Sequence, residues 1–155
     1  MKAVIILLGC CIFASNLCLA AEPNGILKIE GKYVKHLSLY GNGKEVFNEP
    51  NKIINLPVGT YYISEIKLEG DYVCHPYNLS SRELHIKEGQ TTVLGMGAPL
   101  NQNVNILRRG NSLVLNYKLQ GIGGETYFPE VRGNPPKCTI YAGDEEIANC
   151  NFKYG

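Results

Sequence analysis

The segment that most constrains the fold is residues 54–68, INLPVGTYYISEIKL, because it indicates two strands joined by a tight turn. Pro57 stiffens the approach to this turn, and Gly59 provides the backbone freedom that a tight turn uses. The residues after Gly59 are rich in Thr, Tyr and Ile, which favour a pleated, half-buried surface. The segment therefore predicts a β-sandwich, and it indicates no reaction.

The alternation of apolar residues changes phase within residues 60–68. Tyr61 and Ile63 share one face of the expected strand, whereas Ile66 and Leu68 share the other. A β-bulge inserts one extra residue and so resets which side chains point inward. We therefore predict a bulge near Ser64 and Glu65.

The rest of the first half indicates short strands separated by turn residues. The Asn-Gly sequence at residues 41–44 is typical of a hairpin turn, and residues 83–86 and 91–94 are expected to form a second hairpin around residues 88–90. Residues 69–82 are expected to be a long irregular loop. The remaining strands are predicted at residues 26–30, 34–40, 45–47 and 52–56.

The second half has a regular period-two pattern. Leu113, Leu115, Tyr117 and Leu119 fall on one face of a predicted strand, with polar residues between them. Residues 97–101 contain Gly and Pro with few apolar neighbours, and this composition places a domain boundary there. The resulting units are residues 22–99 and 100–155.

The final hairpin brings two cysteines together. If its turn centres on Asp144, Cys138 lies opposite Cys150, and Ile140 lies opposite Ala148 on the same face. Opposed residues in an antiparallel pair have Cα atoms about 4.5–5.5 Å apart, which a disulfide tolerates. We therefore predict a Cys138–Cys150 disulfide, which would contribute about 3 kcal/mol by loop closure.

The first twenty residues are typical of a signal peptide. Lys2 precedes the apolar run 3–14, and Ala20 ends a segment of small residues suited to cleavage. The run is shorter than the ~20 residues that a membrane span needs. Cleavage after Ala20 would remove three of the six cysteines and leave fourteen basic and fourteen acidic residues, with Cys74 unpaired. We expect a secreted or periplasmic protein with no transmembrane span in the mature chain and no affinity for nucleic acid.

Three segments of the first half of the chain resemble a known protein family. Residues 37–43, 56–63 and 88–92 are similar to the strand, glycine turn and return strand of carboxypeptidase-regulatory or transthyretin-like β-sandwiches, over about residues 27–94. Residues 123–127 and 151–155 are similar to segments of uncharacterised secreted bacterial proteins. The resemblance implies an all-β chain, with a transthyretin-like sandwich and a smaller Ig-like β-unit. Such domains act as accessory, adhesive or structural modules, so no catalytic residue is carried over.

Several side chains could carry chemistry. Tyr72, His75 and Tyr77 in the 69–82 loop could form a stacking platform for a sugar or peptide. Cys74 and His75, with His36 and His85, are metal-ligand types, but adjacent residues of an extended chain point to opposite sides. We predict no catalytic residue, metal or cofactor.

The leading hypothesis is a non-enzymatic secreted or envelope-associated module that presents a surface to a protein or glycan at the cell envelope. The first alternative is a carbohydrate-binding module that uses the 69–82 loop. The second is a small hydrolase or metal-dependent enzyme, whose histidines must then converge in one pocket. Neither an esterase elbow (Gly-x-Ser-x-Gly) nor a zinc motif (His-Glu-x-x-His) occurs in the chain.

Overall fold

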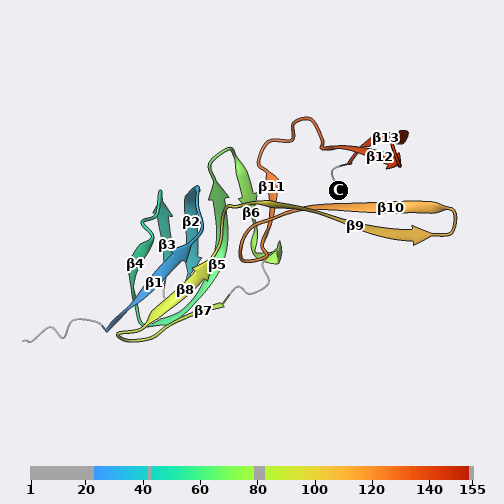
Figure 1. Ribbon diagram of the computed structural model, residues 1–155. Helices are drawn as coiled ribbons and strands as arrows, with labels where there is room; N and C mark the ends of the chain where they lie inside the picture. Colours follow the sequence, from blue (N-terminus) through green and yellow to red (C-terminus); the bar gives the residue numbers. More distant parts are fainter. Residues whose placement is uncertain (1–22, 42, 79–82, 154–155) are drawn as a thin grey trace, which may run out of the picture.

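A computed structural model describes residues 23–41, 43–78 and 83–153, and these residues form an all-β protein (Figure 1). A small sheet has the strand order β4 (Ile53–Pro57), β1 (Asn24–Glu30), β8 (Thr91–Gly95). The large sheet runs in the order β3 (Lys44–Asn48), β2 (Val34–Tyr40), β5 (Gly59–Leu68), β6 (Tyr72–Cys74), β11 (Thr126–Pro129), β10 (Ser112–Gln120), β9 (Asn101–Arg109), and β7 (Glu83–Ile86) also pairs with β5. A separate hairpin consists of β12 (Lys137–Ala142) and β13 (Glu145–Asn151).

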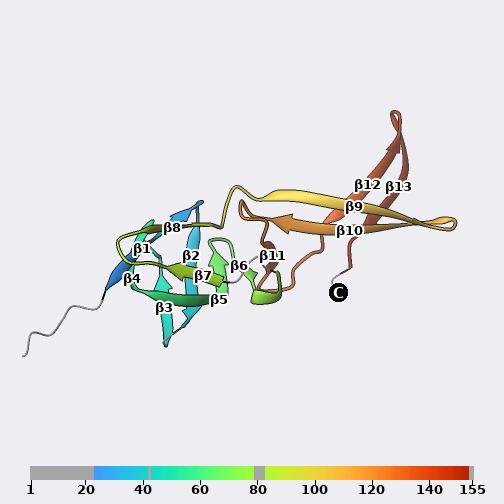
Figure 2. The same cartoon turned by 90° about the horizontal axis from the view of Figure 1, so that it is seen from below.

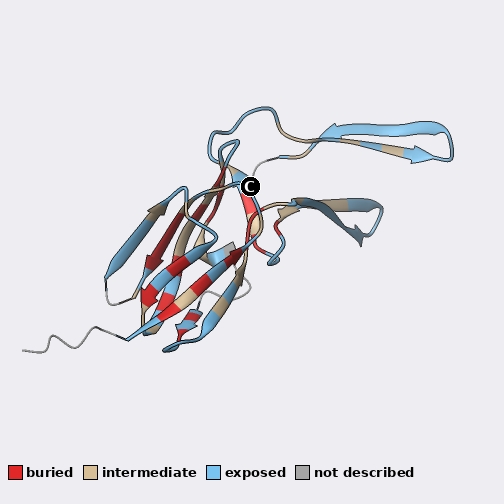
Figure 3. Cartoon of the chain, turned by 60° about the vertical axis from the view of Figure 1, so that its left-hand side comes forward, coloured by how far each residue is buried: buried red, intermediate tan, exposed pale blue. Residues whose placement is uncertain are grey.

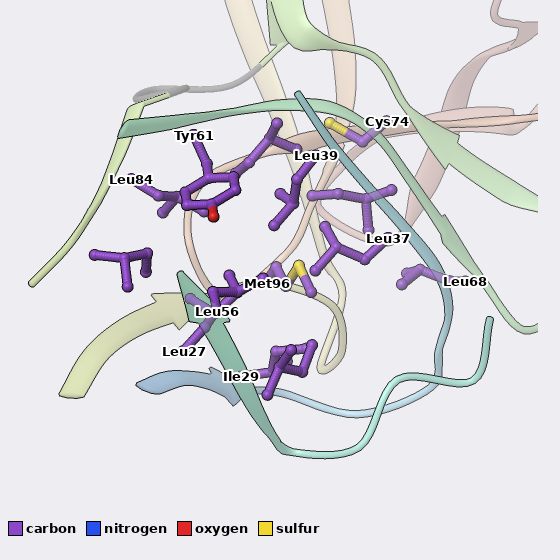
Figure 4. Close-up of a cluster of buried hydrophobic side chains, with 14 of the residues drawn as sticks. Leu27, Ile29, Leu37, Leu39, Leu56, Tyr61, Leu68, Cys74, Leu84 and Met96 are labelled. Atoms are coloured by element: carbon purple, nitrogen blue, oxygen red, sulfur yellow. The ribbon is translucent and has the colours of Figure 1, made fainter. Parts of the chain in front are cut away.

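The core lies between the small sheet and the first strands of the large sheet (Figure 4). Leu27 and Leu56 of the small sheet are buried with Leu37 and Leu39 of the large sheet, and Met96 fills the space beside them. Each fully buried aliphatic side chain contributes about 1.5–3 kcal/mol relative to exposure. Two sheets that bury facing side chains form a β-sandwich, so the predicted fold class is confirmed.

Strand β5 contains the bulge that the phase change predicts. Ser38 of β2 lies opposite Glu65, whereas the next residue, Leu39, lies opposite Ile63, which leaves Ser64 as the extra residue. The Ser64 hydroxyl lies 2.8 Å from Ser38 Oγ, which holds the bulge to β2. Gly59 does not adopt a positive φ, because the chain passes from the small to the large sheet through Val58 alone.

The predicted hairpin of residues 83–86 and 91–94 is wrong, although both strands exist. Strand β7 pairs with β5 in the large sheet, and β8 pairs with β1 in parallel in the small sheet. The turn at Gly89 therefore crosses between sheets. The long loop also contains structure that the sequence did not indicate, namely β6, whose Val73 is buried, and a 3-10 turn at Pro76–Asn78.

Beyond residue 100 the chain forms two hairpins that extend from the sandwich (Figures 1 and 2). We call them the β9–β10 arm and the β12–β13 arm. Only Leu119 and Gln120 of β10 pair with β11, so residues 112–118 pair with β9 alone. Most residues of both arms are exposed (Figure 3).

The predicted register of the last hairpin is confirmed. Cys138 lies opposite Cys150 and Ile140 opposite Ala148, and a bulge then shifts the pairing so that Tyr141 lies opposite Glu146. The two-residue turn at Gly143 and Asp144 replaces the symmetric turn that we expected, and the bulge accommodates the difference.

The division at residues 99 and 100 stays a prediction. The large sheet continues across that point, because β11 pairs with β6, and Tyr127 is part of the main core. The proposed signal sequence, residues 1–20, lies outside the described residues. Within the described part of the chain, no helix has the length and apolar character to cross a membrane.

Candidate functional site

The predicted binding loop forms only part of the expected platform. Tyr72 packs against the core from β6, whereas Tyr77 is 78% exposed on the 3-10 turn. The ring of His75 stacks on Tyr77, with centroids 5.8 Å apart and an angle of 24° between the planes. The two tyrosines therefore do not share a surface, but His75 and Tyr77 do. Residues 79–82 of this loop lie outside the described residues.

His36 and His85 lie far apart on the large sheet. The Nδ1 atom of His36 lies 2.9 Å from Asn48 Oδ1, and that of His85 lies 3.1 Å from Thr60 Oγ1. His36 is opposite Lys67 of β5 and His85 is opposite Thr60, a separation of about 20 Å along that strand. In the described ranges, no three His, Cys, Asp or Glu side chains are arranged to hold a metal ion. The arrangement that an enzyme based on these histidines needs is therefore absent from those ranges.

Cys74 is not suited to nucleophilic or redox chemistry. Its side chain is fully buried, and its thiol lies 3.6 Å from the carbonyl oxygen of His75. Burial, followed by the nearby charge of Glu125, raises the pKa of the Cys74 thiol to about 12. Because the thiolate is the reactive form, this cysteine is inert at neutral pH. Its burial also removes it from contact with a second chain.

Sequence reasoning missed a buried carboxyl group at the base of the β9–β10 arm. Glu125 is 2% exposed, and its Oε1 accepts hydrogen bonds from the Gly97 amide (2.6 Å) and the Tyr127 hydroxyl (2.9 Å). Its Oε2 has no partner among the described residues. Burial, followed by the charge of Glu125, raises the pKa of Tyr127. The glycines at 121 and 123 were the available signal, because their missing Cβ atoms leave room for this carboxyl group.

A polar groove of about 340 Å³ lies on the outer face of the large sheet. Several of its charged side chains pair with one another, because Lys67 binds Glu130 and lies 3.9 Å from Glu65. The hydrogen bond with Lys67 lowers the pKa of Glu130, and the same bond raises that of Lys67. Among the residues that the structure describes, no Ser, Thr or Cys lines the groove. It is therefore a solvated ion-pair network, which contributes little to stability.

The β9–β10 arm exposes an apolar face. Opposed residues share a face of a hairpin, so Leu113, Leu115 and Tyr117 of β10 lie beside Ile106 and Val104 of β9. Ile106 is 60% exposed and Leu113 is 57% exposed. The predicted face of β10 is therefore correct, but its outer half is not buried. Contiguous exposed apolar side chains are typical of interaction surfaces.

The predicted disulfide is not formed in the structure, where Cys138 and Cys150 are both free. The two residues lie opposite each other in the register of the hairpin. Burial, followed by the charge of Cys150 and a hydrogen bond with it, raises the pKa of the Cys138 thiol. The predicted register brings Cys138 and Cys150 opposite each other, but formation of an S–S bond also requires an oxidant.

Comparison of the chain with protein-family models, curated proteins and solved structures finds no match. The transthyretin-like and Ig-like resemblances therefore stay predictions from the sequence, and the functional argument depends on the geometry described above.

Proposed function

We propose that this chain is a non-enzymatic secreted or envelope-associated β-sandwich module that presents its hairpin arms to another macromolecule. The observation that supports the proposal most directly is the exposed apolar face of the β9–β10 arm. The chemically versatile side chains, in contrast, are dispersed (His36, His85), buried (Cys74, Glu125) or paired in an ion network (Lys67).

The extracellular part of the proposal depends on Lys2 and the apolar run 3–14, which are typical of a signal peptide. The resemblance of residues 27–94 to transthyretin-like domains agrees with an accessory or structural role. The register that sets Cys138 opposite Cys150 supports a disulfide that would form in an oxidising compartment and stiffen the β12–β13 arm.

Co-sedimentation with the cell-envelope fraction of the producing organism tests this function. We expect the wild-type protein to sediment with the envelope and the Ile106→Lys/Leu113→Lys variant to remain in the supernatant. The matched control is Ile53→Lys/Val93→Lys, which places the same charges at exposed positions of the small sheet (61% and 51% exposed). If wild-type protein stays in solution, or both variants behave alike, the arm surface is not the binding surface.

A second candidate function is carbohydrate recognition by His75 and Tyr77. The observation that favours it is the stack of the half-buried His75 ring on the exposed Tyr77 ring, which offers an aromatic surface to a sugar ring. Affinity electrophoresis in gels that contain soluble polysaccharides tests it. Retardation of the wild-type protein that is lost in Tyr77→Ala, but kept in the control Tyr33→Ala at another exposed tyrosine (59% exposed), supports recognition at this loop. Identical migration of the three proteins excludes it for the polysaccharides used.

A further inference from the structure

The apolar face of the β9–β10 arm has an ordered composition from base to tip. Tyr117 lies nearest the sandwich, Ile106 and Leu115 face each other in the middle, and Arg108 lies opposite Leu113 near the turn. Residues 101–120 contain Arg108, Arg109 and Lys118 but no acidic residue. The face is therefore aromatic at its base, aliphatic in its middle and positively charged at its tip.

The β12–β13 arm carries the complementary sequence of side chains. Phe152 lies at its base, and Ile140, with Ala148 opposite it, lies in the middle. Because the bulge shifts the register, Glu145 pairs with Ala142 and joins this same face at the tip. Asp144 and Glu146 add negative charge to the turn. The face is therefore aromatic, then aliphatic, then negatively charged, in the same order from base to tip.

Within one chain the two faces do not close on each other. The rings of Tyr117 and Phe152 are in contact, with centroids 5.3 Å apart. The two arms point in different directions, with β12–β13 at an angle to β9–β10 (Figure 2). Among the described residues, no ion pair connects the basic tip with the acidic tip. Both arms extend away from the sandwich, so both faces remain open to another molecule.

The segment that leads into the β12–β13 arm is attached to the sandwich at its start. Residues 130–136 precede β12 and include Pro135 and Pro136, whose fixed φ angles stiffen the chain. The Glu130 amide donates to the Asp71 carbonyl at 2.7 Å, and the Glu130 carboxylate binds Lys67, so the start of the connection is attached to the sandwich. These contacts fix residue 130, and Pro135 and Pro136 restrict the chain just before β12.

We propose that the β9–β10 arm binds the β12–β13 arm of a second copy of this chain, so that two chains associate reciprocally. Each chain carries both complementary faces, and a two-fold axis lets both contacts form at once. Apolar side chains provide the attraction, and the opposite charges of the tips set the direction in which the arms align. The inference rests on the proposed function because both assume that the arms bind another macromolecule. It identifies that macromolecule as a second copy of this chain.

Charge reversal tests the proposal. Sedimentation equilibrium should give twice the chain mass for the wild-type protein. The variants Arg108→Glu/Arg109→Glu and Glu145→Lys/Glu146→Lys should each sediment as monomers, because in each variant both tips carry the same sign. An equimolar mixture of the two variants should again give the mass of two chains, because the acidic tips of one variant meet the basic tips of the other. A matched control, Lys44→Glu/Lys52→Glu, changes the charge of the sandwich and should leave the dimer intact.

Each alternative gives a different result. A wild-type protein that is monomeric at every concentration overturns the proposal, because its arms then close internally or bind only foreign molecules. Variants that stay monomeric after mixing also overturn it, because their tips are complementary only between chains. The envelope assay fails or succeeds independently. A protein that dimerises but does not co-sediment with the envelope contradicts the proposed function and supports this inference. A protein that co-sediments with the envelope but stays monomeric supports the proposed function and contradicts this inference.

Discussion

Replacing Gly121 by Ala tests the role of the buried Glu125 carboxyl group. A Cβ at residue 121 would lie 2.0 Å from Glu125 Oε1 and 2.8 Å from the Gly97 carbonyl oxygen. The carboxyl group must therefore move, and it loses the hydrogen bonds from the Gly97 amide and the Tyr127 hydroxyl. The loss of two buried hydrogen bonds, with the acceptor left unsatisfied, costs about 3–5 kcal/mol. This is a large part of a typical stability of 5–15 kcal/mol.

A double-mutant cycle separates this effect from ordinary crowding. In a Glu125→Ala background the carboxyl group is absent, so Gly121→Ala meets only the Gly97 carbonyl and should cost about 1–2 kcal/mol. The two substitutions should therefore couple by about 2–3 kcal/mol. Gly133→Ala is the control, because its Cβ meets nothing within 4 Å, and it should stay within about 0.5 kcal/mol of the wild type.

Urea unfolding followed by far-UV circular dichroism measures these costs, since the chain has no Trp to report by fluorescence. Additive costs in the cycle would refute the reasoning, because they would mean that residue 121 does not act through the carboxyl group. A Gly121→Ala variant as stable as Gly133→Ala would refute it as well.

Three further predictions follow from individual contacts. The pKa of Cys74 is about 12 in the folded state, against 9.0 ordinarily, so the stability that its buried thiol contributes is complete below pH 9 and is lost as the pH rises toward 12. The free energy of unfolding should therefore fall by about 1.4 kcal/mol between pH 8 and pH 10, and this fall should be missing in Cys74→Val. Under oxidising conditions Cys138 and Cys150 should become unreactive to maleimide, with Cys74 labelled only after unfolding, and mass spectrometry of labelled protein checks this. Burial raises the pKa of Tyr117, so Phe152→Ala, which uncovers that ring, should lower it in a spectrophotometric titration.

The sequence predicted the elements whose signal is local. The phase change across Tyr61, Ile63 and Ile66 located the bulge at Ser64, because alternation reports directly which side chains face the core. The opposition of Cys138 and Cys150 was predictable for the same reason, although the symmetric turn was not.

The elements that the sequence did not predict depend on distant contacts. Strand β7 has the pattern of a hairpin partner for β8, but the chain between them crosses from one sheet to the other. The local sequence, with two glycines before Glu125, is typical of an exposed turn. Only the hydrogen bonds from the Gly97 amide and the Tyr127 hydroxyl show that the Glu125 carboxyl group is enclosed. The loop tyrosines differ in burial because β6 carries Tyr72 to the sheet and the 3-10 turn leaves Tyr77 outside.

The pattern of β10 gives a physical reason to look for a second chain. Alternating apolar residues stabilise a strand only when the face they form is removed from water. The inner residues that β10 contributes to that face are partly covered, because Leu119 packs against the core and Tyr117 meets Phe152. The alternation nevertheless continues to Leu113, which the described part of the chain leaves 57% exposed. A hairpin of this length with two open faces is marginally stable alone, so the same sequence that predicts the strand also requires a surface to cover its outer half.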